Sequence, residues 1–251
     1  MKTLTLGIAL AMCATAIFGA EGTRTPAQAR EAMLKKTGGF VVAPAAGRYI
    51  KVVDAKSGAT RDALEKFTKS VASGPRFAIS IADGDPLAQY MPDTDCGAVV
   101  VVKNDAASPV TITVAPEQGW ASVNVHPLKS DKPDDALFQQ RVIKELWRAL
   151  VYMLGGGNNQ MPACVMKPCA NNKDLDGLKM NQACPEPFRE MSLSAKKLGI
   201  AQSKLVSYRK ACEEGWASPP SNEYQKAIWD EVHKLPTEPI KIEPEAKKVK
   251  E

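Results

Sequence analysis

The spacing of apolar positions alternates between helix and strand periods over residues 22–126. Thr25 followed by Pro26 is typical of a helix start, so we expect a helix over 25–36 that ends before Gly38. A second helix is predicted to begin at Thr60, with an apolar stripe at i, i+3 and i+7. Strands are predicted over 40–42, 49–53, 76–81, 98–102 and 111–114. This mixture predicts a sheet backed by helices.

One more strand is predicted over residues 120–125, where apolar and polar side chains alternate. Alternation is typical of a strand that is half-buried or lies at the edge of a sheet. An edge strand offers unpaired backbone groups, so Trp120, Ser122 and Asn124 are the candidate positions for binding an extended peptide.

The longest helix is predicted over 134–154, where apolar residues form a continuous face, and Gly155 with the two glycines after it ends it. The same apolar pattern is also expected of an ordinary core helix. Residues 158–190 are rich in cysteines and turn residues and show little periodicity. Two further helices are predicted, over 195–212 and 222–235, before a charged tail at 236–251 that we expect to be disordered.

Composition narrows the class of protein. The 251 residues are 44% hydrophobic and 24% charged, as in an average globular protein of one large domain or two small ones. A net charge of +5, spread along the chain, does not indicate a nucleic-acid-binding protein. The chain has two histidines, His126 and His233, which argues against a zinc site built from imidazoles.

The N-terminus is typical of an exported protein. Residues 1–20 combine one lysine, an apolar run and small residues, which indicates a secretory signal peptide. A lipid anchor on Cys13 is disfavoured, because Met12 stands where a lipoprotein signal needs a small residue. No other apolar stretch is long enough to span a membrane. Export favours disulfides, and the mature chain would retain five cysteines: Cys96, Cys164, Cys169, Cys184 and Cys212.

Residues 141–187 resemble the core of the archaemetzincins, a family of zinc peptidases with the pattern HExxHxxGxxHCx4CxM followed, after seventeen residues, by CxxC. With the glycine of the pattern placed on Gly155, Cys164 and Met166 fall at the required CxM spacing. Seventeen residues then separate Met166 from Cys184. The resemblance extends loosely over residues 40–190.

The resemblance does not extend to the catalytic groups. Arg148, Tyr152 and Asn158 stand at the three histidine positions, and Ala149 replaces the glutamate that would act as general base. The charge of Arg148 would oppose a zinc ion, and an ion pair with Glu145 one turn earlier is its simplest use. The resemblance therefore implies a protein without catalytic zinc or any other cofactor.

The family holds a second zinc with four cysteines, and here these positions are Asn159, Cys164, Cys184 and Pro187. Two thiolates do not make a structural zinc site. In an exported protein the resemblance implies instead that Cys164 and Cys184 form a disulfide. The pairing of the other three cysteines stays open.

The implied fold is an α/β (or α+β) metzincin-like zincin with a mixed, twisted sheet, the former active-site helix at its centre and a smaller helical C-terminal part. We expect an N-terminal subdomain at 21–157 and a cysteine-containing subdomain at 158–235. Two functions remain possible. One is an exported, non-catalytic pseudopeptidase that binds an extended peptide or protein. The other is an exported hydrolase with an unrecognised site.

Overall fold

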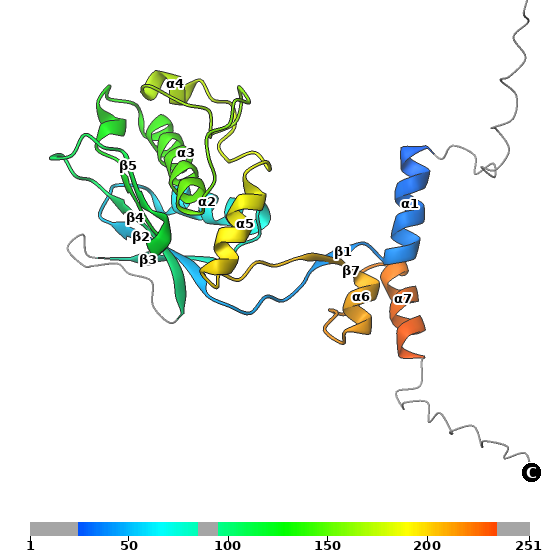
Figure 1. Cartoon of the computed structure of the whole chain (residues 1–251). Coiled ribbons are helices and arrows are strands. Elements are labelled where there is room, and N and C mark those ends of the chain that lie inside the picture. Colours follow the sequence, from blue (N-terminus) through cyan, green and yellow to red (C-terminus); the bar gives the residue numbers. More distant parts are fainter. Residues whose placement is uncertain (1–24, 85–94, 235–251) are drawn as a thin grey trace, which may run out of the picture. The chain divides into compact units, whose positions relative to one another are not determined.

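The computed structural model describes residues 25–84 and 95–234, in a chain that forms two compact units (Figure 1). The larger unit is Val42–Lys204, and the smaller one combines Met1–Val41 with Leu205–Glu251. The backbone N–H of Ala43 donates to the carbonyl of Lys204 at 2.8 Å, so the larger unit begins and ends at neighbouring points. The predicted signal peptide at 1–20 and disordered tail at 236–251 lie outside the described residues.

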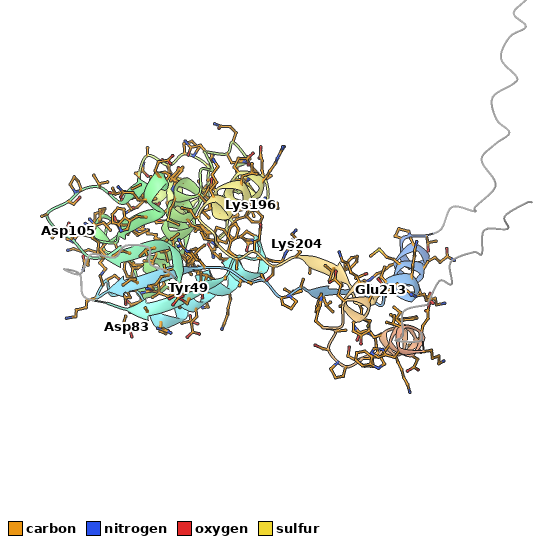
Figure 2. All side chains as sticks on the ribbon, turned by 60° about the horizontal axis from the view of Figure 1, so that its bottom comes forward. Tyr49, Asp83, Asp105, Lys196, Lys204 and Glu213 are labelled. Atoms are coloured by element: carbon orange, nitrogen blue, oxygen red, sulfur yellow. The ribbon has the colours of Figure 1, made fainter. Side chains whose placement is uncertain are left out.

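The larger unit is built on a mixed five-stranded sheet. Its strand order is β3-β2-β4-β6-β5, in which β2, β3, β4 and β6 are parallel and β5 is antiparallel to β6. Tyr49 begins β2, whereas Asp83 and Asp105 lie at the other end of the sheet, at and beyond the ends of β3 and β4 (Figure 2). The strands are β2 (Tyr49–Ala55), β3 (Ile79–Asp83), β4 (Cys96–Lys103), β5 (Ile112–Ala115) and β6 (Trp120–Asn124).

The burial of β4 explains its sequence. Its central position exposes neither face to water, and a run of valines suits such a strand because β-branched side chains pack well on a pleated surface. Val100 and Val102 face the main core with the helices, while Val99 and Val101 pack on the opposite face. The mixed α/β architecture predicted from the sequence is confirmed.

Helix α3 (Asp135–Met153) is the central element of the core. It begins where the Asp134 side chain accepts from the N–H of Leu137 at 2.8 Å. Its Trp147 stacks on Phe188 and meets Phe67 edge to face, with ring centroids 6.3 and 5.7 Å apart. The other helices of this unit are α2 (Arg61–Ser73), α4 (Asn172–Asp176) and α5 (Phe188–Lys197), with 3₁₀ turns at Pro116–Gln118 and Pro127–Lys129.

In its described residues, 25–41 and 205–234, the smaller unit contains three helices and a two-stranded sheet. Tyr208, Cys212 and Ile228 form its core. The predicted capping of the first helix is confirmed, because the Thr25 hydroxyl accepts from the N–H of Gln28 at 3.3 Å. Its elements are α1 (Pro26–Thr37), β1 (Phe40–Val42), β7 (Leu205–Ser207), α6 (Tyr208–Glu213) and α7 (Glu223–His233).

Two predicted elements differ from the structure. The predicted helix over 195–212 is interrupted, because α5 ends at Lys197 and Gly199 adopts a left-handed conformation with φ of 72°. The chain then runs extended into β7 before α6 begins. The strand predicted over 76–81 starts three residues later, because Arg76 has a positive φ of 62° that is incompatible with a regular strand.

The prediction of an edge strand at 120–125 is wrong. β6 pairs with β4 on one side and with β5 on the other, so its backbone has no free edge. Ser122 and Asn124 are buried rather than exposed to solvent. The Asn124 amide binds the loop after β4 by accepting from the N–H of Asp105 and donating to the carbonyls of Asp105 and Ser108. Alternation here marks a buried polar contact rather than a solvent-facing side.

The structure also divides the chain at positions other than the predicted boundary between 157 and 158. Three basic side chains of α3 donate to acceptors within 165–178: Lys144 and Arg148 to backbone carbonyls, and Arg141 to the Asp176 carboxylate. The segment after the glycines is therefore part of the same compact unit as the helix before them.

Candidate functional site

Arg148 lies on α3 where the archaemetzincin pattern has its first histidine, and its guanidinium is fixed against the segment after the glycine turn. Nη1 donates to the carbonyls of Val165 at 2.9 Å and Lys167 at 2.8 Å. The side chain is only 10% exposed. The guanidinium therefore cross-links the helix to the 165–167 segment through charge-assisted hydrogen bonds.

The structure brings together the three residues that stand at the histidine positions of the pattern. Nη2 of Arg148 lies 3.5 Å from the Tyr152 hydroxyl, which donates to Oδ1 of Asn158 at 2.6 Å. Burial raises the pKa of Tyr152, so this hydroxyl keeps its proton and acts as a donor. Ala149, at the position of the general base, is fully buried in the core.

Glu145 is the unusual group of this cluster. Its side chain is 9% exposed, and its Oε1 lies 3.5 Å from Nε of Arg148, which itself is buried without a hydrogen bond. Burial raises the pKa of Glu145 to about 7, and the nearby Arg148 guanidinium opposes this effect only in part. The predicted ion pair between Glu145 and Arg148 is thus present, and burial favours the protonated form of the carboxyl group.

Cys169 belongs to the same cluster, although the sequence did not place it there. Its Sγ contacts the carbonyl of Lys167 at 3.4 Å, the same oxygen that accepts from Arg148. Burial raises the pKa of this thiol, while the nearby Arg148 lowers it to a smaller extent. The two residues meet at the Lys167 carbonyl through a tertiary contact, so sequence spacing carries no signal for it.

These residues do not fit a catalytic zinc ion. Zinc needs neutral imidazole, thiolate or carboxylate donors that face one point. Here a permanent cation stands at the first position and directs its N–H groups at carbonyl oxygens, and the Tyr152 hydroxyl is hydrogen-bonded to Asn158. Among the described residues, no group of three or more histidine, cysteine or acidic side chains is arranged to hold a metal ion.

Two of the four positions that correspond to the family's second zinc site, Cys164 and Cys184, lie close together. Sγ of Cys164 is 2.8 Å from Sγ of Cys184, both thiols are buried, and no disulfide joins them in this structure. The amide of Asn159 donates to the carboxylate of Glu186. Pro187 precedes the first residue of α5 and contributes no donor to this group.

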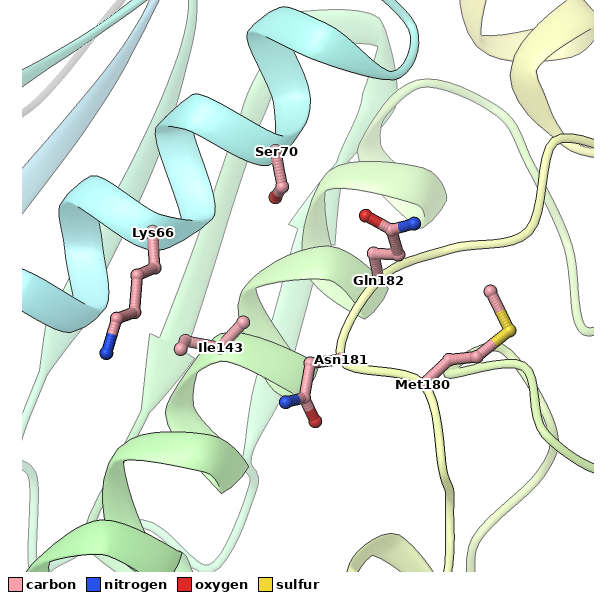
Figure 3. Close-up of a pocket in the computed structure, with 6 residues that line it drawn as sticks. All are labelled: Lys66, Ser70, Ile143, Met180, Asn181 and Gln182. Atoms are coloured by element: carbon pink, nitrogen blue, oxygen red, sulfur yellow. The ribbon is translucent and has the colours of Figure 1, made fainter.

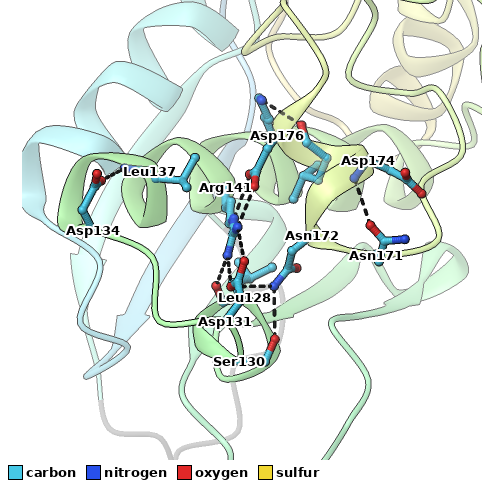
Figure 4. A network of polar contacts seen from close by, with 12 residues as sticks. Leu128, Ser130, Asp131, Asp134, Leu137, Arg141, Asn171, Asn172, Asp174 and Asp176 are labelled. Carbon is cyan, nitrogen blue, oxygen red and sulfur yellow. Dashed lines mark hydrogen bonds and ion pairs between the residues drawn. The ribbon is translucent and has the colours of Figure 1, made fainter.

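A second charged cluster, missed by the sequence analysis, anchors the other half of α3 (Figure 4). Arg141 is 1% exposed, and its guanidinium donates two hydrogen bonds each to Asp131 and Asp176, at 2.5 to 2.8 Å, and one to the carbonyl of Leu128. These bonds lower the pKa of Asp131 to about 2. Lys144 donates to the carbonyls of Leu175 and Leu178 in place of a carboxylate partner. All these bonds are satisfied internally, which indicates a structural role.

A pocket of about 270 Å³ lies between α2, α3 and residues 180–182 (Figure 3). Its lining contains none of the predicted site residues. Lys66 at its rim is already paired with Asp62 at 2.6 Å. Its size falls below the usual range for small-molecule sites.

In the described part of the chain, no helix is both long and apolar enough to cross a membrane.

Comparisons with known proteins give two solved structures. The archaemetzincin of Methanopyrus kandleri is 18% identical with a TM-score of 0.46, over 59% of this chain and 96% of that one. A zinc-dependent peptidase from Methanocorpusculum labreanum is 15% identical with a TM-score of 0.44, over 57% of this chain and 99% of that one. No protein-family model and no curated protein matches the chain.

Proposed function

We propose that this chain is an exported, non-catalytic protein on a metzincin-like scaffold, a pseudopeptidase that binds an extended peptide or protein segment without cleaving it. The observation that carries the proposal is the Arg148 guanidinium. It stands at the first histidine position of the zinc-peptidase pattern and hydrogen-bonds Val165 and Lys167. A cation fixed in this way performs the cross-linking that a metal would perform and excludes zinc by charge.

Peptide binding is assigned to β5 rather than to β6. Among the described residues β5 pairs only with β6, so one of its sides is an edge. Thr111 accepts from the N–H of Asn124 at 2.7 Å, which makes residues 111, 113 and 115 the ones that bond to β6. The backbone N–H and C=O groups of Ile112 and Val114 therefore point outward, where an added strand would pair with them. The side chains of both residues pack against the core that contains α3.

The non-catalytic part is tested on the mature protein. Zinc is measured by mass spectrometry, and casein and a fluorogenic peptide library are incubated with the protein, with and without a chelator. We expect far less than stoichiometric zinc and no cleavage. Stoichiometric zinc with cleavage that the chelator abolishes would overturn the proposal. Cleavage that resists the chelator would favour the alternative of a hydrolase with a different site.

The binding part is tested with two variants at one position of β5. Val114→Pro removes an outward N–H but leaves the hydrogen bonds to β6 intact, because proline is tolerated at such edge positions. Val114→Ala is the matched control, since it loses the side chain and keeps the N–H. With a fluorescein-labelled random peptide library as probe, we expect binding by the alanine variant and loss of binding by the proline variant. Equal binding by both contradicts the role of β5, and no binding by the wild-type protein contradicts peptide capture altogether.

A further inference from the structure

Two segments of the larger unit, 159–167 and 180–186, run against each other beside α3. The N–H of Met180 donates to the carbonyl of Ala163 at 3.0 Å. The N–H of Cys184 donates to Sγ of Cys164 at 3.3 Å, and Asn159 binds Glu186. The first of these contacts joins backbone to backbone, the second backbone to side chain and the third two side chains, so the relative position of the segments does not rest on the two thiols alone.

The two thiols lie at the centre of this contact. Sγ of Cys164 and Sγ of Cys184 are 2.8 Å apart, and the residues are 0% and 1% exposed. This separation is well below an ordinary non-bonded contact, which is about 3.5–4.0 Å even between the smaller carbon atoms. Two buried thiol groups gain little from such an approach, whereas a covalent bond requires it.

We propose that Cys164 and Cys184 form a disulfide in the mature protein. The oxidant is a disulfide of a small thiol, such as oxidised glutathione, or of a thiol oxidoreductase. One cysteine attacks that disulfide as a thiolate and releases one reduced thiol. The second then displaces the other thiol and closes the Cys164–Cys184 bond. The two cysteines lose two electrons and two protons, and the oxidant leaves as two thiols.

The surroundings decide when this bond forms. Burial, together with the contact to Cys164, raises the pKa of the Cys184 thiol to about 11, so almost none of it is thiolate in the folded protein. Both sulfur atoms are also closed to a reagent from solvent. The bond therefore forms during folding, before the core closes, and afterwards resists reduction for the same reasons.

The bond would hold a segment on which α3 depends. The chain between the two cysteines contains α4, whose Asp176 binds Arg141, and the carbonyls that accept from Lys144 and Arg148. A cross-link over a loop of about 20 residues removes conformational freedom of the unfolded chain. It thereby favours the state in which these three basic side chains are satisfied.

The experiment uses the full chain, unfolded in urea with a reducing agent and refolded in a buffer of oxidised and reduced glutathione. Free thiols are then alkylated in denaturant, and the peptides are mapped by mass spectrometry. We expect one linked peptide pair that contains Cys164 and Cys184, with a folding equilibrium constant roughly a hundred-fold above that of the reduced protein. We also expect the native oxidised protein to be reduced by dithiothreitol at least ten times more slowly than in urea.

Serine variants test which cysteines form the bond. Cys164→Ser and Cys184→Ser should each lose the linked pair, and the matched control Cys169→Ser should retain it, because the Cys169 thiol donates to the Lys167 carbonyl instead. The wild-type peptide map decides the matter even if a serine variant fails to fold. Full alkylation of Cys164 and Cys184 in a refolded chain with native circular dichroism overturns the proposal. So does thiol protection that a chelator removes, since a metal would then hold the two sulfurs.

Discussion

Removal of the Arg148 guanidinium tests whether it holds the 165–167 segment against α3. Arg148→Met keeps the aliphatic stem and loses the two hydrogen bonds to Val165 and Lys167. Bonds from charged donors contribute about 1.5–3 kcal/mol each. Val165 is buried and would leave its carbonyl unpaired, whereas Lys167 is exposed and water can replace the lost donor. We therefore expect the free energy of unfolding to fall by about 3 kcal/mol, towards the low end of the range for breaking a buried pair.

The assay is urea unfolding at neutral pH, followed by far-UV circular dichroism. Arg61→Met on α2 is the matched control, because Arg61 is 56% exposed and its ion pair with Glu65 spans one helical turn at 3.5 Å. Such surface pairs contribute at most about 1 kcal/mol. A loss below about 0.5 kcal/mol in Arg148→Met, the usual scatter of surface substitutions, would refute the reasoning. The guanidinium would then be solvated and not locked against the carbonyls.

Three further results follow from the same contacts. The pKa of Glu145 is about 7 in the folded protein and 4.5 in the unfolded chain, so its contribution to stability is full below pH 4.5 and is lost as the pH rises through 7. Glu145→Gln should remove this loss of about 3 kcal/mol from the free energy of unfolding measured in urea over a pH series. An unchanged dependence of that free energy on pH would contradict the buried carboxyl. Arg141→Met should lower the free energy of unfolding by about 3 kcal/mol, since Asp131 and Asp176 lose their shared cation, and a change no larger than that of Arg61→Met would argue against the network. Asn124→Ala should cost about 1–3 kcal/mol and open residues 105–108 to limited proteolysis, whereas Asn104→Ala, at an exposed neighbouring position, should leave the cleavage rate unchanged.

The local sequence is sufficient to predict those elements whose stabilising contacts are also local. Thr25 and Thr60 cap the helices predicted to start at them, and Asp134, the predicted start of the longest helix, caps α3, because capping depends on bonds to residues within the first turn. Asn124 shows the limit of this reasoning. A polar residue in an alternating strand can face either water or a buried loop, and only the fold decides which. Its partners at 105 and 108 lie sixteen or more residues away, so alternation by itself places the strand at the sheet edge.

The candidate site could likewise be predicted from the sequence only in part. Motif spacing is enough to bring Arg148, Tyr152 and Asn158 into one cluster, because three positions on and just after one helix have fixed geometry. Arg141 and Lys144 were not predicted. Helical periodicity assigns charged residues to the solvent side, and here α4 covers that side with carboxylate and carbonyl acceptors. Their burial depends on a tertiary contact that carries no periodic signal.

The hydrogen bond between Ala43 and Lys204 has a consequence for how this chain can be cut and rejoined. A unit whose first and last residues are neighbours is an insertion in the topological sense, and the flanking segments form one domain interrupted in sequence. Residues 43–204 can therefore be excised, closed with a short turn and reopened at an exposed loop as a circular permutant. The smaller unit, with its two halves joined directly across the gap, becomes a continuous chain of its own. Each piece can then be given separately to the same peptide library, which turns one two-unit protein into two independent binding assays.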